Sequence, residues 1–270
     1  MALKNRFAGH TNSYHTYSLD EALEGIAAAG FKFVELTAVR GWTEHVPLDA
    51  DAKTLGAIQR KLHTLGLIPV SLSGHSDLTT KAGLDDGLLA LDLCERLGID
   101  LMNTAVGGHS SVDESEEAFF EHIGALADAA AAKGIMLGIE IHGDLTSSGR
   151  KAIPIIDKIG RDNVRVNYDT ANIEFYDNGT KAVDDLPATV PYLVHLHAKD
   201  HIGGARAWNF PAPGEGQIDW VKVLQILDQG GYTGPISVEI EFAEGPWPPL
   251  AEVNRAMKSA YRHLSGLGLS

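Results

Sequence analysis

Four glycines, each followed by a large apolar residue, recur along the first half of the chain between a helix-like and a strand-like segment. They are Gly30, Gly66, Gly98 and Gly134, and the residues after them are Phe, Leu, Ile and Ile. Glycine just beyond the last helical turn is a typical helix stop, because it tolerates the left-handed backbone needed there. A repeated helix–Gly–strand order predicts successive βα units that share one parallel sheet.

Hydrophobic periodicity predicts eight such units. Ser18 with Glu21 forms the pattern of a capping box at the start of the first helix. Strands are predicted at 6–10, 33–37, 68–73, 100–105, 136–141, 164–169, 192–197 and 236–241. Helices are predicted at 18–29, 51–65, 84–97, 114–133, 152–159, 182–190, 219–229 and 250–263.

Eight βα units without a change in composition favour the α/β class, as a single (β/α)8 TIM barrel. We expect residues 1–270 to form a single TIM-barrel domain, because no linker, low-complexity tract or short repeat interrupts them. An open doubly wound sheet is the alternative. It is disfavoured because no Gly-x-Gly-x-x-Gly follows the first strand.

Composition limits the partners. The formal net charge of −14 argues against nucleic acid or an anionic membrane surface, since both are bound through basic patches. A single cysteine, Cys94, excludes an intramolecular disulfide and fits a reducing compartment. The N-terminal region lacks the pattern of a secretory signal, and no apolar run approaches transmembrane length. We therefore expect a cytoplasmic protein that acts on a small molecule.

Four acidic or imidazole residues lie at the C-terminal ends of four predicted strands: Glu140, Asp169, His197 and Glu239. The carboxyl ends of barrel strands and the loops after them form the active rim. Three carboxylates and one imidazole suit one hard or borderline divalent ion, Mn²⁺, Mg²⁺, Co²⁺ or Zn²⁺. The pattern predicts a metal site at this rim.

Five ordered motifs resemble the xylose-isomerase-like TIM barrels. They are residues 138–142 (Gly-Ile-Glu-Ile-His), 167–172 (Asn-Tyr-Asp-Thr-Ala-Asn), 195–200 (His-Leu-His-Ala-Lys-Asp), 214–220 (Gly-Glu-Gly-Gln-Ile-Asp-Trp) and 231–239 (Gly-Tyr-Thr-Gly-Pro-Ile-Ser-Val-Glu). That superfamily holds sugar isomerases and epimerases, inosose dehydratases, hydroxypyruvate isomerases and apurinic-site endonucleases. Oligomers are common in that superfamily, so the resemblance is compatible with a homo-oligomer of this chain.

The resemblance implies the same four metal ligands, and it decides two choices. His195 and His197 point the same way on a strand, and the family's His-x-x-Asp pattern matches His197 with Asp200. Glu239 takes the family's position after the Gly234 turn, which leaves Glu241 as a rim residue. The family's epimerases usually carry a histidine three residues after the metal aspartate, where this chain has Asn172.

The chemistry of such a site is proton transfer beside a carbonyl. A divalent ion would stabilise the enediolate charge, while Glu140 and Glu239 act as bases on opposite sides of a bound sugar. Proton exchange on both faces of the carbon gives epimerisation. Exchange on one face, with a proton shuttled between neighbouring carbons, gives isomerisation. The predicted activity is a metal-dependent ketose or polyol isomerase or epimerase.

Three alternatives remain. The same chemistry could run a lyase or dehydratase reaction on a keto-sugar or inosose. A phosphodiesterase of the apurinic-site endonuclease type is disfavoured by Asn172, by the absence of Asp-x-His after strand seven, and by the net charge. A non-catalytic binding barrel is least favoured, because both candidate carboxylates are present.

Further residues on the loops after the strands are candidates for substrate binding. We predict that role for His142, Asn172, His75, His109, Trp42, Lys199, Arg206 and Trp208. Lys199 could instead pair with Asp200. Glu35 is a weaker site candidate that points to the barrel mouth or pairs with a neighbour. We expect ordinary loop polarity at His10, Tyr14 and His15, and surface positions at His45, His63 and His122.

Overall fold

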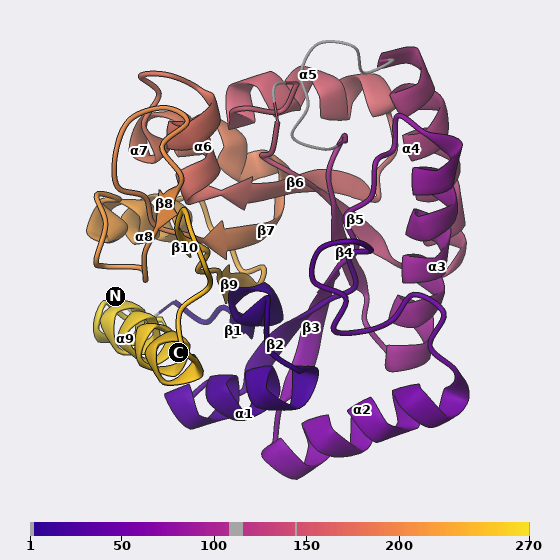
Figure 1. The fold of residues 1–270 in the computed structure, drawn as a ribbon. Coiled ribbons are helices and arrows are strands. Elements are labelled where there is room, and N and C mark those ends of the chain that lie inside the picture. The colour runs from indigo at the N-terminus through magenta and orange to yellow at the C-terminus, as the bar shows by residue number, and fades with distance from the viewer. Residues whose placement is uncertain (1–2, 108–115, 144, 270) are drawn as a thin grey trace.

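The computed structural model describes residues 3–107, 116–143 and 145–269, and within them the chain forms a closed parallel barrel of eight strands surrounded by helices (Figure 1). The strand order is β1-β2-β3-β4-β5-β6-β7-β9, and β1 closes the barrel by pairing with β9 through Phe7 and Ile236. This confirms the predicted (β/α)8 TIM barrel. None of the helices in these ranges is long and apolar enough to cross a membrane.

The barrel strands agree with the predicted ones to within about two residues, except at the last strand. They are β1 Phe7–His10, β2 Phe33–Thr37, β3 Ile68–Ser73, β4 Leu101–Thr104, β5 Met136–Glu140, β6 Val164–Asp169, β7 Leu193–Ala198 and β9 Ile236–Val238. The predicted strand 236–241 is too long. Its chain leaves the barrel and forms β10 (Phe242–Ala243), which pairs antiparallel with β8 (Asn209–Phe210). Phe242 makes that turn in the left-handed backbone region, with φ of 60°.

Several of the helices begin and end at recognisable caps. The helices are α1 Leu19–Ala29, α2 Ala52–Leu65, α3 Lys81–Leu97, α4 Glu116–Ala132, α5 Gly149–Ile159, α6 Thr170–Tyr176, α7 Ala182–Thr189, α8 Trp220–Gln229 and α9 Leu250–Gly266. The Ser18–Glu21 capping box is present, and Gly30, Gly66 and Gly98 end their helices with positive φ, as predicted.

Three predicted helix bounds are wrong, and one helix was not predicted. Helix α9 ends at Gly266 rather than at residue 263. Helix α3 begins at Lys81 rather than at residue 84, because the Thr80 side chain caps it by accepting from Gly83 N. Helix α5 begins at Gly149 rather than at residue 152. Helix α6 was not predicted at all. It follows β6 directly, because Asp169 ends the strand and also caps the helix, accepting from the backbone N–H groups of Ala171 and Asn172.

Polar side chains fill the middle of the barrel below the rim. Asn103 on β4 donates to Glu35 on β2 at 2.7 Å, and His195 on β7 contacts Asn167 on β6 at 2.9 Å. Gly138 on β5 makes room for them, since a Cβ there would lie 2.4 Å from Asn103 Oδ1. The candidate site sits on this polar layer, at the carboxyl ends of the strands.

Candidate metal centre and active site

The structure brings Glu140, Asp169, His197 and Glu239 together at the carboxyl end of the barrel; we call these four residues the tetrad. One ligand atom from each lies within 4.8 Å of the others, and all four residues are buried. His197 Nδ1 lies 3.2 Å from Glu140 Oε1, 3.5 Å from Glu239 Oε2 and 4.0 Å from Asp169 Oδ2. These spacings suit a single ion at a common point.

Two tetrad oxygens support that reading. Asp169 Oδ2 and Glu239 Oε2 are buried and accept no hydrogen bond. Lys199 Nζ lies 3.4 Å from Glu239 Oε2 and 3.7 Å from Asp169 Oδ2 without hydrogen-bonding either oxygen, and coordination of a cation would satisfy both. The other oxygens are held by the protein, since Asp169 Oδ1 caps α6 and Glu239 Oε1 accepts from Asn12 Nδ2 at 2.9 Å. The donor set therefore fits one divalent metal ion.

The tetrad places three carboxylates close together, and their proximity affects the pKa of Asp169. Burial, opposed by Lys199 and reinforced by the nearby Glu140 and Glu239 carboxylates, raises the pKa of Asp169 to about 8. Burial alone would also raise the pKa of Glu140, but His75 and His197 hold that pKa well below its usual range. A site in which one carboxylate keeps its proton at neutral pH is electrostatically suited to bind a cation.

The two histidines of β7 have different environments. Burial lowers the pKa of His195 to about 3, so its ring is neutral. Burial would also lower the pKa of His197, but Glu35, Glu140 and Glu239 raise it well above the usual value. His197 contacts the tetrad carboxylates, whereas His195 does not. His197 is the member of the pair that the sequence predicts as the ligand.

Glu140 is held by groups from three other strands or loops. His197 Nδ1 and Asn172 Nδ2 (3.3 Å) face its Oε1, and His75 Nε2 contacts its Oε2. His75 Nδ1 in turn lies 2.7 Å from Ser73 Oγ. The Ser73–His75 pair therefore fixes the second oxygen of Glu140, the one that is free of the His197 contact.

Glu239 is held from the opposite side. Asn12 bridges its Oε1 to Glu241 Oε1, at 2.9 and 3.2 Å, and His10 Nδ1 lies 3.1 Å from the same Glu239 oxygen. Asn12 Oδ1 accepts from Trp42 Nε1 and Thr43 Oγ1, so the loop after β2 orients Asn12.

A cavity of about 290 Å³ opens above the tetrad. Its volume is at the small end of the range for ligand pockets. Six predicted substrate-binding residues line it: His75, His142, Asn172, Trp42, Lys199 and Trp208. Phe175, Tyr176 and Phe210 complete an aromatic wall. Arg206 lies in an adjoining hollow with Trp42 and Trp208, its guanidinium 4.9 Å from the Tyr176 ring centre. His109 lies outside the described residues. The substrate roles of these residues stay predictions.

Several sequence-based interpretations were wrong. His10 and Tyr14 are buried, and His10 stacks 5.0 Å from His197 instead of lying in an ordinary polar loop. His15 stacks on Trp42 at 3.9 Å. His45 and His122 are half-buried and contact the carbonyls of Tyr17 and Leu78. His63 is exposed, as expected.

Lys199 pairs with Glu241 and not with Asp200, the alternative partner named from the sequence. Lys199 Nζ contacts Glu241 Oε2 at 2.5 Å, whereas Asp200 accepts from backbone groups of the following loop and from Trp220 Nε1. Glu241 follows β9 at the rim, as expected, and is a buried member of the cavity wall. Asn12 was missed altogether, because its position after β1 carries no motif.

A family model described as "Xylose isomerase-like TIM barrel" matches residues 23–263. Among curated proteins, "L-ribulose-5-phosphate 3-epimerase UlaE" of Salmonella typhimurium (strain LT2) is 26% identical over 263 residues, covering 92% of this chain and 91% of that protein. Among solved structures, D-allulose 3-epimerase from Methylomonas sp. is 21% identical, with a TM-score of 0.76 and coverage of 99% and 100%. D-psicose 3-epimerase from Clostridium cellulolyticum H10 is 17% identical, with a TM-score of 0.78 and coverage of 98% and 100%. The solved structures share the fold.

Proposed function

Because this chain belongs to the xylose isomerase-like TIM barrel family, we propose that it is a divalent-metal-dependent sugar epimerase that inverts the carbon next to a ketose carbonyl. The observation that carries the proposal is the convergence of Glu140 and Glu239. They stand three strands apart around the barrel, yet both reach the His197 ring and both line the same cavity.

Epimerisation needs two proton-exchanging groups on opposite faces of one carbon. One carboxylate removes the proton from the carbon beside the carbonyl, and the other delivers a proton to the opposite face. A divalent ion held by the tetrad would stabilise the negative charge that develops on the carbonyl oxygen. Tight contacts fix both carboxylates: Glu140 through His75, and Glu239 through Asn12 and His10. Such preorganisation favours a defined proton path.

We further propose that the substrate is unphosphorylated. Among the described residues that line the cavity, the lysine and arginine side chains are Lys199 and Arg40, and each is paired with a carboxylate, Glu241 and Asp86 respectively. The sequence at 108–115 adds no lysine or arginine. A phosphate group usually requires a dedicated cation or helix N-terminus. In this respect the proposed substrate differs from the one in the printed name of the Salmonella protein.

A panel of ketoses tests both proposals. We expect Mn²⁺- or Co²⁺-loaded protein to interconvert ketoses that differ at one carbon next to the carbonyl, to lose this activity in EDTA and to regain it with metal. L-ribulose should be turned over with a higher kcat/KM than L-ribulose 5-phosphate. Formation of aldoses would indicate an isomerase, loss of water a lyase, and either result would contradict the epimerase proposal.

A further inference from the structure

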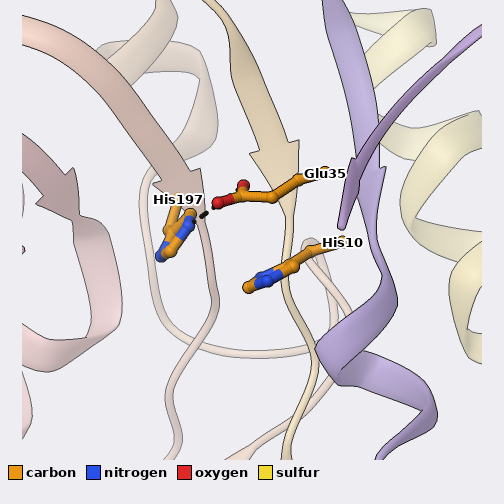
Figure 2. Close-up of side chains that lie close together, drawn as sticks. All are labelled: His10, Glu35 and His197. Atoms are coloured by element: carbon orange, nitrogen blue, oxygen red, sulfur yellow. Dashed lines mark hydrogen bonds and ion pairs between the residues drawn. The ribbon is translucent and has the colours of Figure 1, made fainter. Parts of the chain in front are cut away.

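Glu35 lies buried inside the barrel beside His197, and a dashed line joins the two side chains in Figure 2. Its side chain is fully inaccessible to solvent. Glu35 Oε2 lies 3.2 Å from His197 Nε2, and Glu35 Oε1 accepts a hydrogen bond of 2.7 Å from Asn103 Nδ2. A buried ionised carboxylate is costly to retain, so these two contacts call for an explanation beyond packing.

The contact determines which nitrogen of His197 keeps its proton when an ion binds. A carboxylate only accepts hydrogen bonds, so His197 must donate to Glu35 through Nε2–H. Nδ1 also faces a carboxylate, Glu140 Oε1 at 3.2 Å, so in the metal-free protein both nitrogens can donate; an ion that binds His197 would replace the proton on Nδ1 and leave Nε2–H toward Glu35. Nδ1 faces Glu140, Asp169 and Glu239, as a metal ligand must.

His195 does not compete for this role. Its Nε2 lies 3.4 Å from Glu35 Oε2, but it also lies 3.0 Å from Ser237 Oγ, while its Nδ1 contacts Asn167 Oδ1 at 2.9 Å. An acceptor at Nδ1 places the ring proton there, which leaves Nε2 of the neutral ring to accept from serine. Among the described groups, His197 and Asn103 are thus the donors to Glu35.

We propose that Glu35 is a positioning residue that holds His197 in its Nε2–H tautomer and so presents Nδ1 to a divalent ion in the tetrad. The inference rests on the metal-binding part of the proposed function and is independent of the substrate and of the reaction. Carboxylates that orient metal-bound histidines typically contribute about 10- to 100-fold to metal affinity.

A different reading of the same residues is a second ion held by His10, Glu35 and His197, whose ligand atoms lie within 4.8 Å of one another. The direct contact between Glu35 and His197 already satisfies both atoms. His10 is also engaged, with Nε2 3.1 Å from Thr37 Oγ1 and Nδ1 facing Glu239. We therefore expect one ion per chain.

Mn²⁺ binding to the metal-stripped protein, measured without substrate, tests the proposal. Glu35→Gln keeps an acceptor for Nε2–H but removes the charge, whereas Glu35→Leu removes both. We expect the Kd to rise by about 10-fold or more in Glu35→Gln and further in Glu35→Leu. Asp185→Asn is the matched control, because Asp185 is an equally buried carboxylate that accepts hydrogen bonds from the first N–H groups of α5 and from Tyr168 rather than from a tetrad side chain. It should lower the melting temperature and leave the Kd unchanged.

The tautomer can be measured in the unaltered protein, so the test survives a variant that fails to fold. In Zn²⁺-loaded protein with ¹⁵N-labelled histidine, His197 should show a protonated Nε2 and a metal-bound Nδ1. Binding through Nε2, a Kd for Glu35→Gln within threefold of wild type, or two Mn²⁺ ions per chain would each overturn the proposal. Failure of the unaltered protein to bind any ion would instead refute the proposed metal centre itself.

Discussion

The ammonium group of Lys199 lies 2.5 Å from the carboxylate of Glu241, in the wall of the cavity and beside the tetrad. It is also 3.4 Å from Glu239 Oε2 and 3.7 Å from Asp169 Oδ2. Burial opposes its charge, but Glu239, Glu241 and Asp169 hold the pKa of Lys199 well above its usual value. A fixed positive charge thus stands next to the position that we assign to a metal cation.

Lys199→Met should therefore tighten metal binding while lowering turnover. Two like charges a few ångströms apart repel, and removing one should strengthen Mn²⁺ affinity by about tenfold or more. Lys181→Met is the control, because Lys181 pairs with Glu174 outside the cavity. Titration of free Mn²⁺ by electron paramagnetic resonance gives both affinities. Weaker binding in Lys199→Met would show that Lys199 supports the site rather than competing with the ion.

Metal affinity should rise with pH. The pKa of Asp169 in the metal-free protein is raised to about 8 from an ordinary 3.8, and that of His197 is raised as well. A ligand must lose its proton before it coordinates, so binding at pH 7 should release about one to two protons. Mn²⁺ affinity should fall as the pH drops from 8 to 6. Calorimetry in buffers of different ionisation enthalpy measures the release, and pH-independent binding without proton release would contradict the arrangement.

Asn172→Ala should raise KM more than it lowers kcat. The amide lines the cavity and cannot take up a proton, so we assign it to binding. Asn172 Nδ2 also donates to Glu140 Oε1 at 3.3 Å and to Ile141 O at 2.9 Å. Because the variant loses these hydrogen bonds, we expect kcat to fall by up to about tenfold. Initial rates over a range of ketose concentrations separate the two constants. A large loss of kcat at unchanged KM would place Asn172 in the chemical step.

Glu140→Gln and Glu239→Gln should each lower kcat by about 100- to 10,000-fold, because an amide cannot act as a base. The fold should remain, since glutamine has the same shape and can keep one oxygen toward the ion. Glu174→Gln is the control, because Glu174 is a buried glutamate bound to Lys181 and Gln217. Rates near wild type in either tetrad variant would remove it from the proton path.

The barrel and the tetrad were predictable from the sequence because each depends on patterns within short segments of the chain. An apolar strand that ends in an acid or a histidine delivers that side chain to a known rim, and a helix–Gly–strand repeat sets the topology. Helix α6 was not predicted, because Asp169 is both a predicted metal ligand and the cap of this helix.

The supporting contacts could not be predicted, because they join distant parts of the chain. Asn12 contacts Glu239 across 227 positions of sequence, and Glu35 contacts His197 across 162. Nothing around Asn12 distinguishes it from an ordinary polar residue, and Glu35 is only a weaker site candidate whose partner the sequence does not name. Only closure of the barrel brings β1 and β2 against β7 and the end of β9.

Solvent isotope exchange distinguishes two-carboxylate epimerisation at this site from isomerisation. Metal-loaded protein is incubated in D₂O with a free ketose that it turns over, and deuterium is located by NMR. Two-carboxylate epimerisation predicts deuterium at C3, the stereocentre next to the carbonyl, in the product epimer. The hydroxymethyl carbon C1 on the other side of the carbonyl should stay unlabelled. One of the Glu140→Gln and Glu239→Gln variants should keep exchange in the unconverted substrate while forming no product. Epimer formation without any deuterium at C3, or an aldose product with deuterium at the former carbonyl carbon, would contradict two-carboxylate epimerisation.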